Sequence, residues 1–166
     1  QKIALSRTVY TYNGKVQSPS VIVKDSEGKS LRNGTDYTVT VPKGRKEIGS
    51  YTYTIKFKGN YAGVVTRSMV INPKATTLSK VKGYKKYFIA KWKKYNVKNT
   101  GYELQYSTNA RFRSGTKTKA VKSYKTVSLK VKTAKKKYYV RIRTYKRVGR
   151  KNYYSAWSKA KTVKVK

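Results

Sequence analysis

The sequence predicts an all-β protein made of two tandem antiparallel β-sandwiches, and three observations carry this prediction. Short runs of residues alternate between apolar and polar side chains, as expected for half-buried strands. Turn signals rich in Gly, Asn and Pro separate these runs at intervals of roughly ten residues, which is the spacing of sandwich strands. No segment shows the apolar periodicity of a helix.

The first predicted strands lie in residues 2–24. A β-rich run over residues 2–12 ends at Asn13-Gly14, which is a strong tight-turn signal. Residues 21–24 form the next predicted strand, and residues 25–28 turn the chain again.

Clear alternation marks the remaining strands of the first half. Tyr37, Val39 and Val41 alternate with polar residues, the longest alternation follows Gly49, and residues 64–71 complete the set. The apolar side of the longest run could be a sugar-stacking stripe. Such a side is more often the core face of a sandwich, and we assign it there. Its residues are Tyr51, Tyr53, Ile55 and Phe57.

A change in charge density at Pro73 predicts a domain boundary. Residues 1–73 carry 12 basic and 4 acidic side chains, a net charge of +8, whereas residues 74–166 carry 30 basic and 1 acidic, a net charge of +29. We therefore expect one domain over residues 1–73 and a second, lysine-rich domain over residues 74–166.

The second half repeats the alternation of the first. Residues 109–118 are polar and predict a loop, and residues 120–132 supply one or two strands. Three predicted strands each place a set of apolar residues inward. These sets are Phe88, Ala90 and Trp92; Tyr102, Leu104 and Tyr106; and Val127, Leu129 and Val131.

Residues 138–158 predict an antiparallel hairpin that turns at Gly149. The apolar residues Tyr138, Val140 and Ile142 lie on one face of its first strand. Planar cations and aromatic rings interleave on the other face, where they could stack on one another, on sugars or beside anionic groups. The candidate ligand-binding residues of this face are Tyr139, Arg141, Arg143 and Tyr145, and Trp157 on the returning strand could join them.

The net charge of +37 is the dominant property of the composition. Such a charge attracts polyanions through counterion release, with strong sensitivity to salt, and opposes close self-association. We therefore expect a monomer that also binds nucleic acid non-specifically in vitro. We expect the lysines of the second half to fall on both sheets, which predicts diffuse attraction. Lys130 and Lys132 are the candidate contacts, and Lys91, Lys93 and residues 135–137 add to the same charge.

The composition argues against catalysis. The chain has no cysteine and no histidine, so it lacks thiolate metal ligands, disulfides and the usual general base at neutral pH. Its five carboxylates are too few and too scattered for an acid pair or an acidic calcium loop. We expect no catalytic residue, no metal and no cofactor. No apolar run approaches the ~20 residues that cross a bilayer, and the strand-like start at Gln1 suggests a piece of a longer chain.

The second half resembles a fibronectin type III domain over essentially its whole length. The resemblance rests on the three spaced apolar sets that include Phe88, Tyr102 and Tyr138, and on the stretch Ser155-Ala156-Trp157-Ser158. It implies that Tyr138 is a tyrosine corner, whose hydroxyl bonds back to the preceding loop. It also implies that Trp157 stacks between Arg141 and Arg143. On this basis we favour a self-stacked structural ladder for those three residues, and expect Tyr139 and Tyr145, at its ends, to be more available to a ligand.

The first half resembles the Ig-like repeats of surface and secreted proteins of Gram-positive bacteria. The motifs that carry this resemblance are Tyr12-Asn13-Gly14-Lys15, residues 34–39 (GTDYTV) and residues 59–63 (GNYAG). Together the two resemblances imply the tail of an exported or cell-wall-associated protein. We expect a non-catalytic spacer that anchors its neighbours through anionic wall polymers such as teichoic acids. The alternative is an adhesin module that binds a glycan: mucin, glycosaminoglycan or a starch-like polymer.

Overall fold

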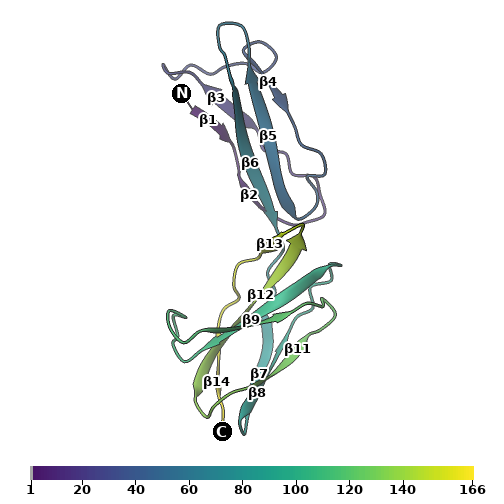
Figure 1. Cartoon of the computed structure of the whole chain (residues 1–166), viewed down its shortest axis with the longest axis vertical. Helices are drawn as coiled ribbons and strands as arrows, with labels where there is room; N and C mark the ends of the chain where they lie inside the picture. The colour runs from purple at the N-terminus through teal and green to yellow at the C-terminus, as the bar shows by residue number, and fades with distance from the viewer. Residues whose placement is uncertain (1) are drawn as a thin grey trace. The chain divides into compact units, whose positions relative to one another are not determined.

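The computed structural model describes residues 2–166, and every regular element within them is a β-strand. The strands form two compact units, one that ends at Asn72 and one that spans Pro73–Lys166, a division one residue before the expected one. Each unit is built from two sheets (Figure 1). The all-β prediction of tandem sandwiches is therefore confirmed.

Six strands build the first unit. Four of them form a sheet in the order β2–β6–β5–β4, and β1 pairs with β3 in a second sheet. The bounds of the strands are Lys2–Leu5 (β1), Val9–Thr11 (β2), Val21–Lys24 (β3), Tyr37–Thr40 (β4), Gly49–Phe57 (β5) and Val64–Asn72 (β6).

The predicted run over residues 2–12 is divided between these two sheets. After β1 the chain crosses to the larger sheet, where β2 lies parallel to β6. Backbone bonds fix both ends of the crossing, because Ser6 N donates to Ser20 O at 2.9 Å and Val70 N donates to Thr8 O at 2.8 Å. Among the paired strands of residues 2–166, β2 and β6 are the one parallel pair, which departs from the expected antiparallel pattern.

The core of the first unit lies between its sheets. Tyr53, Ile55 and Phe57 are buried on β5, where they face buried side chains such as Val23 of the smaller sheet. Tyr51, at the start of the same face, is half-buried and packs against this core. The assignment of this face to the core is confirmed.

Eight strands build the second unit. One sheet has the order β10–β9–β12–β13, with β14 also paired to β12, and the other has the order β11–β8–β7. The bounds are Leu78–Tyr84 (β7), Tyr87–Trp92 (β8), Thr100–Ser107 (β9), Lys117–Val121 (β10), Ser128–Lys132 (β11), Lys137–Val148 (β12), Lys151–Tyr154 (β13) and Lys161–Lys164 (β14).

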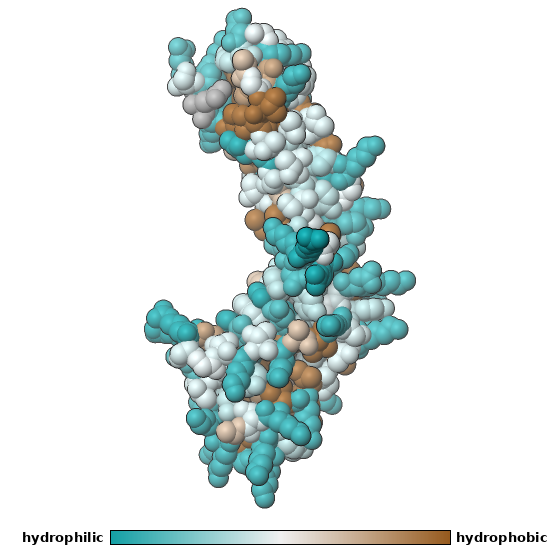
Figure 2. Space-filling model, viewed as in Figure 1, coloured by the Kyte–Doolittle hydropathy of each residue, from teal (hydrophilic) through white to brown (hydrophobic). Residues whose placement is uncertain are grey.

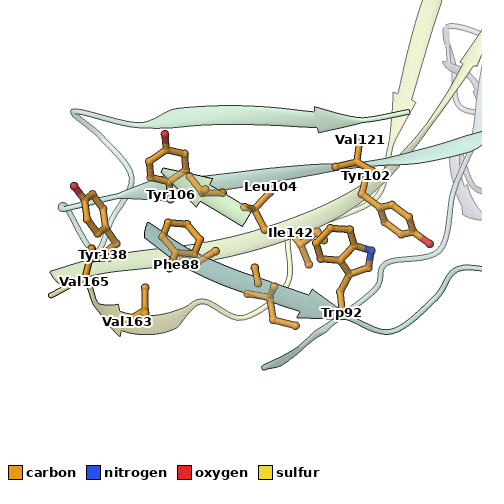
Figure 3. Close-up of a cluster of buried hydrophobic side chains, with 14 residues drawn as sticks. Phe88, Trp92, Tyr102, Leu104, Tyr106, Val121, Tyr138, Ile142, Val163 and Val165 are labelled. Atoms are coloured by element: carbon orange, nitrogen blue, oxygen red, sulfur yellow. The ribbon is translucent and has the colours of Figure 1, made fainter. Parts of the chain in front are cut away.

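Alternating apolar residues of both sheets fill the core of the second unit (Figure 3). Phe88 on β8 lies edge-on to Tyr106 on β9, with ring centroids 5.5 Å apart, and Trp92 lies 5.3 Å from Tyr102. The predicted inward sets of β8 and β9 are confirmed. In the third set Val131 is buried and Leu129 partly so, but Val127 is 38% exposed. Val127 precedes β11, so it does not follow the alternation of that strand.

Tyr138 forms the expected corner at the start of β12. Its hydroxyl accepts a hydrogen bond from Thr133 Oγ1 at 2.7 Å and donates to Ala134 O at 3.3 Å. The ring is buried against Phe88 and Tyr106. The corner therefore ties the loop before β12 to the core.

The predicted hairpin of residues 138–158 is present, but its return is interrupted. β12 pairs with β13 up to Tyr154 and then, nearer its own start, with β14. Trp157 lies between β13 and β14, so its expected place on a returning strand is wrong. The backbone still follows β12 there, because Ser155 N donates to Thr144 O and Ser158 N to Ile142 O.

Candidate functional site

The outward face of β12 carries two arginines that are each held by a partner on β9. In the β9–β12 register Arg141 lies opposite Gln105, and Arg143 lies opposite Glu103. Arg141 donates from Nε and Nη2 to Gln105 Oε1, at 2.9 and 2.7 Å. Arg143 makes the same pair of bonds to Glu103 Oε2, also at 2.9 and 2.7 Å. Each guanidinium is thus held by one edge, which leaves its two flat faces for rings.

Aromatic rings cover those faces. Arg141 lies 4.1 Å from the centroid of Phe112 and 4.6 Å from that of Trp157. Arg143 lies 4.3 Å from the centroid of Trp157 and 3.6 Å from that of Tyr154. Cations and rings therefore alternate in a ladder. We call the residues Phe112, Arg141, Trp157, Arg143 and Tyr154 the arginine–ring ladder.

Two serines place Trp157 over the arginines. The buried backbone N–H of Thr144 donates to Ser155 Oγ at 3.0 Å, and that of Ile142 donates to Ser158 Oγ at 3.1 Å. The hydroxyls thus take over bonds that a regular strand would make with its backbone. Thr144 and Ile142 are two residues apart on β12, whereas their partners Ser155 and Ser158 are three residues apart on the returning chain. The returning chain therefore bulges, and Trp157 lies on the outer face.

The tyrosines at the two ends of the face are both half-buried, but they have different surroundings. Tyr145 lies opposite Gly101, and its ring is so close that a Cβ on Gly101 would lie 2.8 Å from it. Burial, and then the charge of Glu103, raise the pKa of Tyr145, so this ring is packed in place. Tyr139, at the other end, is half-buried, and Lys137 Nζ lies 5.5 Å from its ring centroid.

The ladder is chemically a closed set of contacts. Burial lowers the pKa of Arg141, and the neighbouring charge of Arg143 lowers it further, which reflects two cations held side by side and partly out of water. Both faces and one edge of each guanidinium are already in contact with groups of the chain. The ladder therefore adds contacts between β9, β12 and the segment after β13, and of the flanking tyrosines Tyr145 is packed closely on Gly101.

Lys130 and Lys132 lie elsewhere, on β11. Both are exposed, and Lys130 Nζ lies 4.0 Å from the ring centroid of Tyr87. With Lys117 and Lys119 of β10 they line an open cleft of ≈ 860 Å³. The candidate residues thus form two separate groups, the arginine face of β12 and this lysine cleft.

Sequence reasoning missed several partners in both groups. Phe112 lies in the predicted polar loop, which gave no sign of its contact. Its backbone has a positive φ of 55°, and its ring lies against Arg141. Lys117 and Lys119 were also missed, although their two-residue spacing from the buried Val121 was a usable signal that they share its inward face.

Within residues 2–166, no group of three or more acidic side chains could hold a metal ion. None of the described segments is a helix long and apolar enough to cross a bilayer.

No family model matches the chain, and no curated protein matches its sequence. The crystal structure of the chicken CNTN1 FN1-FN3 domains is similar at 10% sequence identity and a TM-score of 0.42. The match covers 70% of this chain and 42% of the CNTN1 chain, so it spans less than half the length of the CNTN1 chain.

Proposed function

We propose that this chain is a non-catalytic spacer and anchor of an exported bacterial protein, held at the cell surface by electrostatic binding to anionic wall polymers. The observation that carries the proposal is that the positive charge of the second unit is not neutralised within that unit. Glu103 is the one acid in residues 74–166, and Arg143 already binds it. The lysines of that unit therefore have no carboxylate in their own unit to neutralise them.

The distribution of these lysines supports a surface role. Long hydrophilic side chains project from the surface, as the viewed face shows (Figure 2). Polymers such as teichoic acids carry repeated phosphates, and a lysine that neutralises a phosphate releases bound counterions. Binding of this kind needs no deep pocket. On this proposal the protein lies outside the cell, where such polymers are exposed.

The arginine–ring ladder supports the spacer part of the proposal. It uses its cations and rings on one another and covers the outer face of β9 and β12 with contacts inside the unit. A unit built this way is suited to hold a fixed shape while its lysines meet the polymer.

Retention on purified bacterial walls tests the proposal. We expect the chain to be retained at low salt, to be released steeply as salt rises, and to be displaced by free teichoic acid but not by neutral dextran. Walls stripped of teichoic acid should not retain it. Retention that ignores salt, or that survives stripping, contradicts the proposal.

A glycan-binding module is the second candidate, and one feature favours it. The rings of Tyr84 and Tyr87 stack at 4.8 Å with an interplanar angle of 11°, and both are half-buried. Lys82 Nζ lies 5.4 Å from the Tyr84 ring. A glycan array separates the candidates: binding to neutral sugars that survives high salt and is lost in Tyr87→Ala or Tyr139→Ala favours the glycan.

A further inference from the structure

The strands β10 and β11 leave the second unit open along one side. β10 ends the order of one sheet and β11 ends the order of the other, so each has a strand partner on one side only among residues 2–166. The cleft of ≈ 860 Å³ lies along these two edges. Its lining includes Lys117 and Lys119 from β10, and Lys130 and Lys132 from β11.

Two of these lysines occupy core-facing positions. On β10, Lys117, Lys119 and Val121 share one face, and Val121 is buried. In register they lie opposite Tyr106, Leu104 and Tyr102, which are the inward residues of β9. Lys117 and Lys119 therefore point toward the space between the sheets, where apolar residues would be expected. They remain exposed because the cleft is open.

The floor and rim of the cleft differ in character. Tyr106, Leu129 and Val131 give it an apolar floor, whereas Lys130 and Lys132 alternate with them on the outward face of β11. Figure 3 shows the hydroxyl of Tyr106 directed away from Phe88. No acid lines the cleft. Glu103, the one acid of this half, alternates with the inward residues of β9 and binds Arg143 on the outer face.

We infer that this cleft is the seat of an extended polyol phosphodiester chain, such as poly(glycerol phosphate), which lies along β10 and β11. The inference rests on the proposed function and gives it a location. Lysines two residues apart on a strand repeat at about 6.8 Å. Successive phosphates of a glycerol phosphate chain are separated by six covalent bonds, P–O–C–C–C–O–P, so an extended chain has a phosphate repeat of the same order.

A thin chain fits this cleft better than a polysaccharide. Sugar rings are bound by exposed aromatic faces, but Tyr106 is 4% exposed and is the one aromatic residue in the lining. The carbon units of a polyol need only apolar contact, which Leu129 offers. The phosphates need cations, which Lys117 and Lys119 supply from the inward face of β10. Lys130 and Lys132 add charge at the rim on β11, where Lys130 Nζ also lies 4.0 Å from the Tyr87 ring centroid.

Two charge-matched variants of the whole chain test the location. The cleft variant carries Lys117→Gln, Lys119→Gln, Lys130→Gln and Lys132→Gln. The control carries Lys98→Gln, Lys151→Gln, Lys159→Gln and Lys161→Gln, four exposed lysines outside the cleft lining. With purified poly(glycerol phosphate), log K falls as log salt rises. We expect this slope to become less negative by roughly three in the cleft variant, and by about one or less in the control.

The outcomes distinguish the location from the function. Equal losses in the two variants overturn the cleft while leaving electrostatic anchoring intact. Absence of salt-dependent binding by the unmodified chain overturns the function itself. Inward lysines can also prevent pairing between sheet edges of different molecules. If that is their only role, the cleft variant should self-associate and bind the polymer as before, which also overturns the cleft as the binding site.

A measurement on the unmodified chain is independent of variant folding. Bound polymer should protect Lys117 and Lys119 from acetylation, measured by mass spectrometry, while Lys98 and Lys151 stay reactive. Uniform protection contradicts the proposal. An oligodeoxynucleotide of equal charge serves as the competing ligand, and equal affinity and equal protection by it would overturn the choice of a polyol chain.

Discussion

Arg143 donates two hydrogen bonds to a single carboxylate oxygen of Glu103, from Nε at 2.9 Å and from Nη2 at 2.7 Å. Both side chains are partly buried, and Glu103 is the one acid in residues 74–166. The pair therefore has two consequences. It anchors the arginine–ring ladder, and it leaves the lysines of the second unit without a negative partner in that unit.

Glu103→Ala should destabilise the second unit by about 1–2 kcal/mol, because Arg143 would keep its charge beside Arg141 without a partner. Glu103→Gln should lose less, since an amide oxygen can still accept from the guanidinium. Urea denaturation of both variants measures the difference. Stability equal to that of the unmodified chain in both cases would show that the pair contributes nothing.

Trp157→Ala should cost about 2 kcal/mol, because two ring–cation contacts and part of a large apolar side chain are lost together. Trp157→Phe should retain part of this stability. Thermal unfolding measures the order, which we expect to be unmodified chain, then Phe, then Ala. Wall binding at low salt should be the same for all three, and a large loss of binding in Trp157→Ala would assign the ladder to the ligand.

Gly101→Ala and Gly49→Ala form a matched pair. A Cβ on Gly101 would lie 2.5 Å from Val121 O and 2.8 Å from the Tyr145 ring, whereas one on Gly49 would meet nothing nearer than 3.6 Å. We expect the first change to destabilise its unit by about 1–3 kcal/mol and the second to be nearly neutral. Equal effects would contradict the close approach of β9, β10 and Tyr145.

Alkaline pH should weaken the second unit partly through Tyr106. Burial, and then the nearby Tyr138 hydroxyl, raise the pKa of Tyr106 above its usual 10.0. Below pH 10 the Tyr106 hydroxyl keeps its proton in both the unfolded and the folded chain, so stability does not depend on pH through this group there. Above it the unfolded chain loses the proton first, and stability falls as pH rises toward the folded pKa.

Tyr106→Phe provides the control for that prediction. The variant has no hydroxyl to ionise at this position, so it should lose less stability than the unmodified chain between pH 9 and pH 11, as measured by urea denaturation. All other groups are the same in both proteins, so their contributions cancel in the comparison. A larger loss in the variant would contradict the assignment.

The sequence was sufficient where a property is local and periodic. Phe88, Ala90 and Trp92 repeat every two residues, so their shared burial follows from the pleat of a strand. The corner at Tyr138 was implied by the resemblance of this half to a fibronectin type III domain. Both are decided within a few residues of the chain, and the structure confirms both.

Other features depend on contacts between distant parts of the chain. The parallel pairing of β2 is decided by where the chain crosses between sheets, and the position of Trp157 by hydroxyls that bond to β12. Val127 fits the alternation of its neighbours but lies outside β11. Lys117 and Lys119 stay exposed on an inward face because β10 is an edge strand, and that position depends on the pairing of distant strands.

The salt dependence of binding to purified wall polymer tests the central claim most directly, namely that unneutralised lysines govern what this chain binds. With affinity measured by fluorescence titration across a salt series, the account predicts a straight line of log K against log salt with a slope steeper than about −3. A flat line at measurable affinity would contradict it.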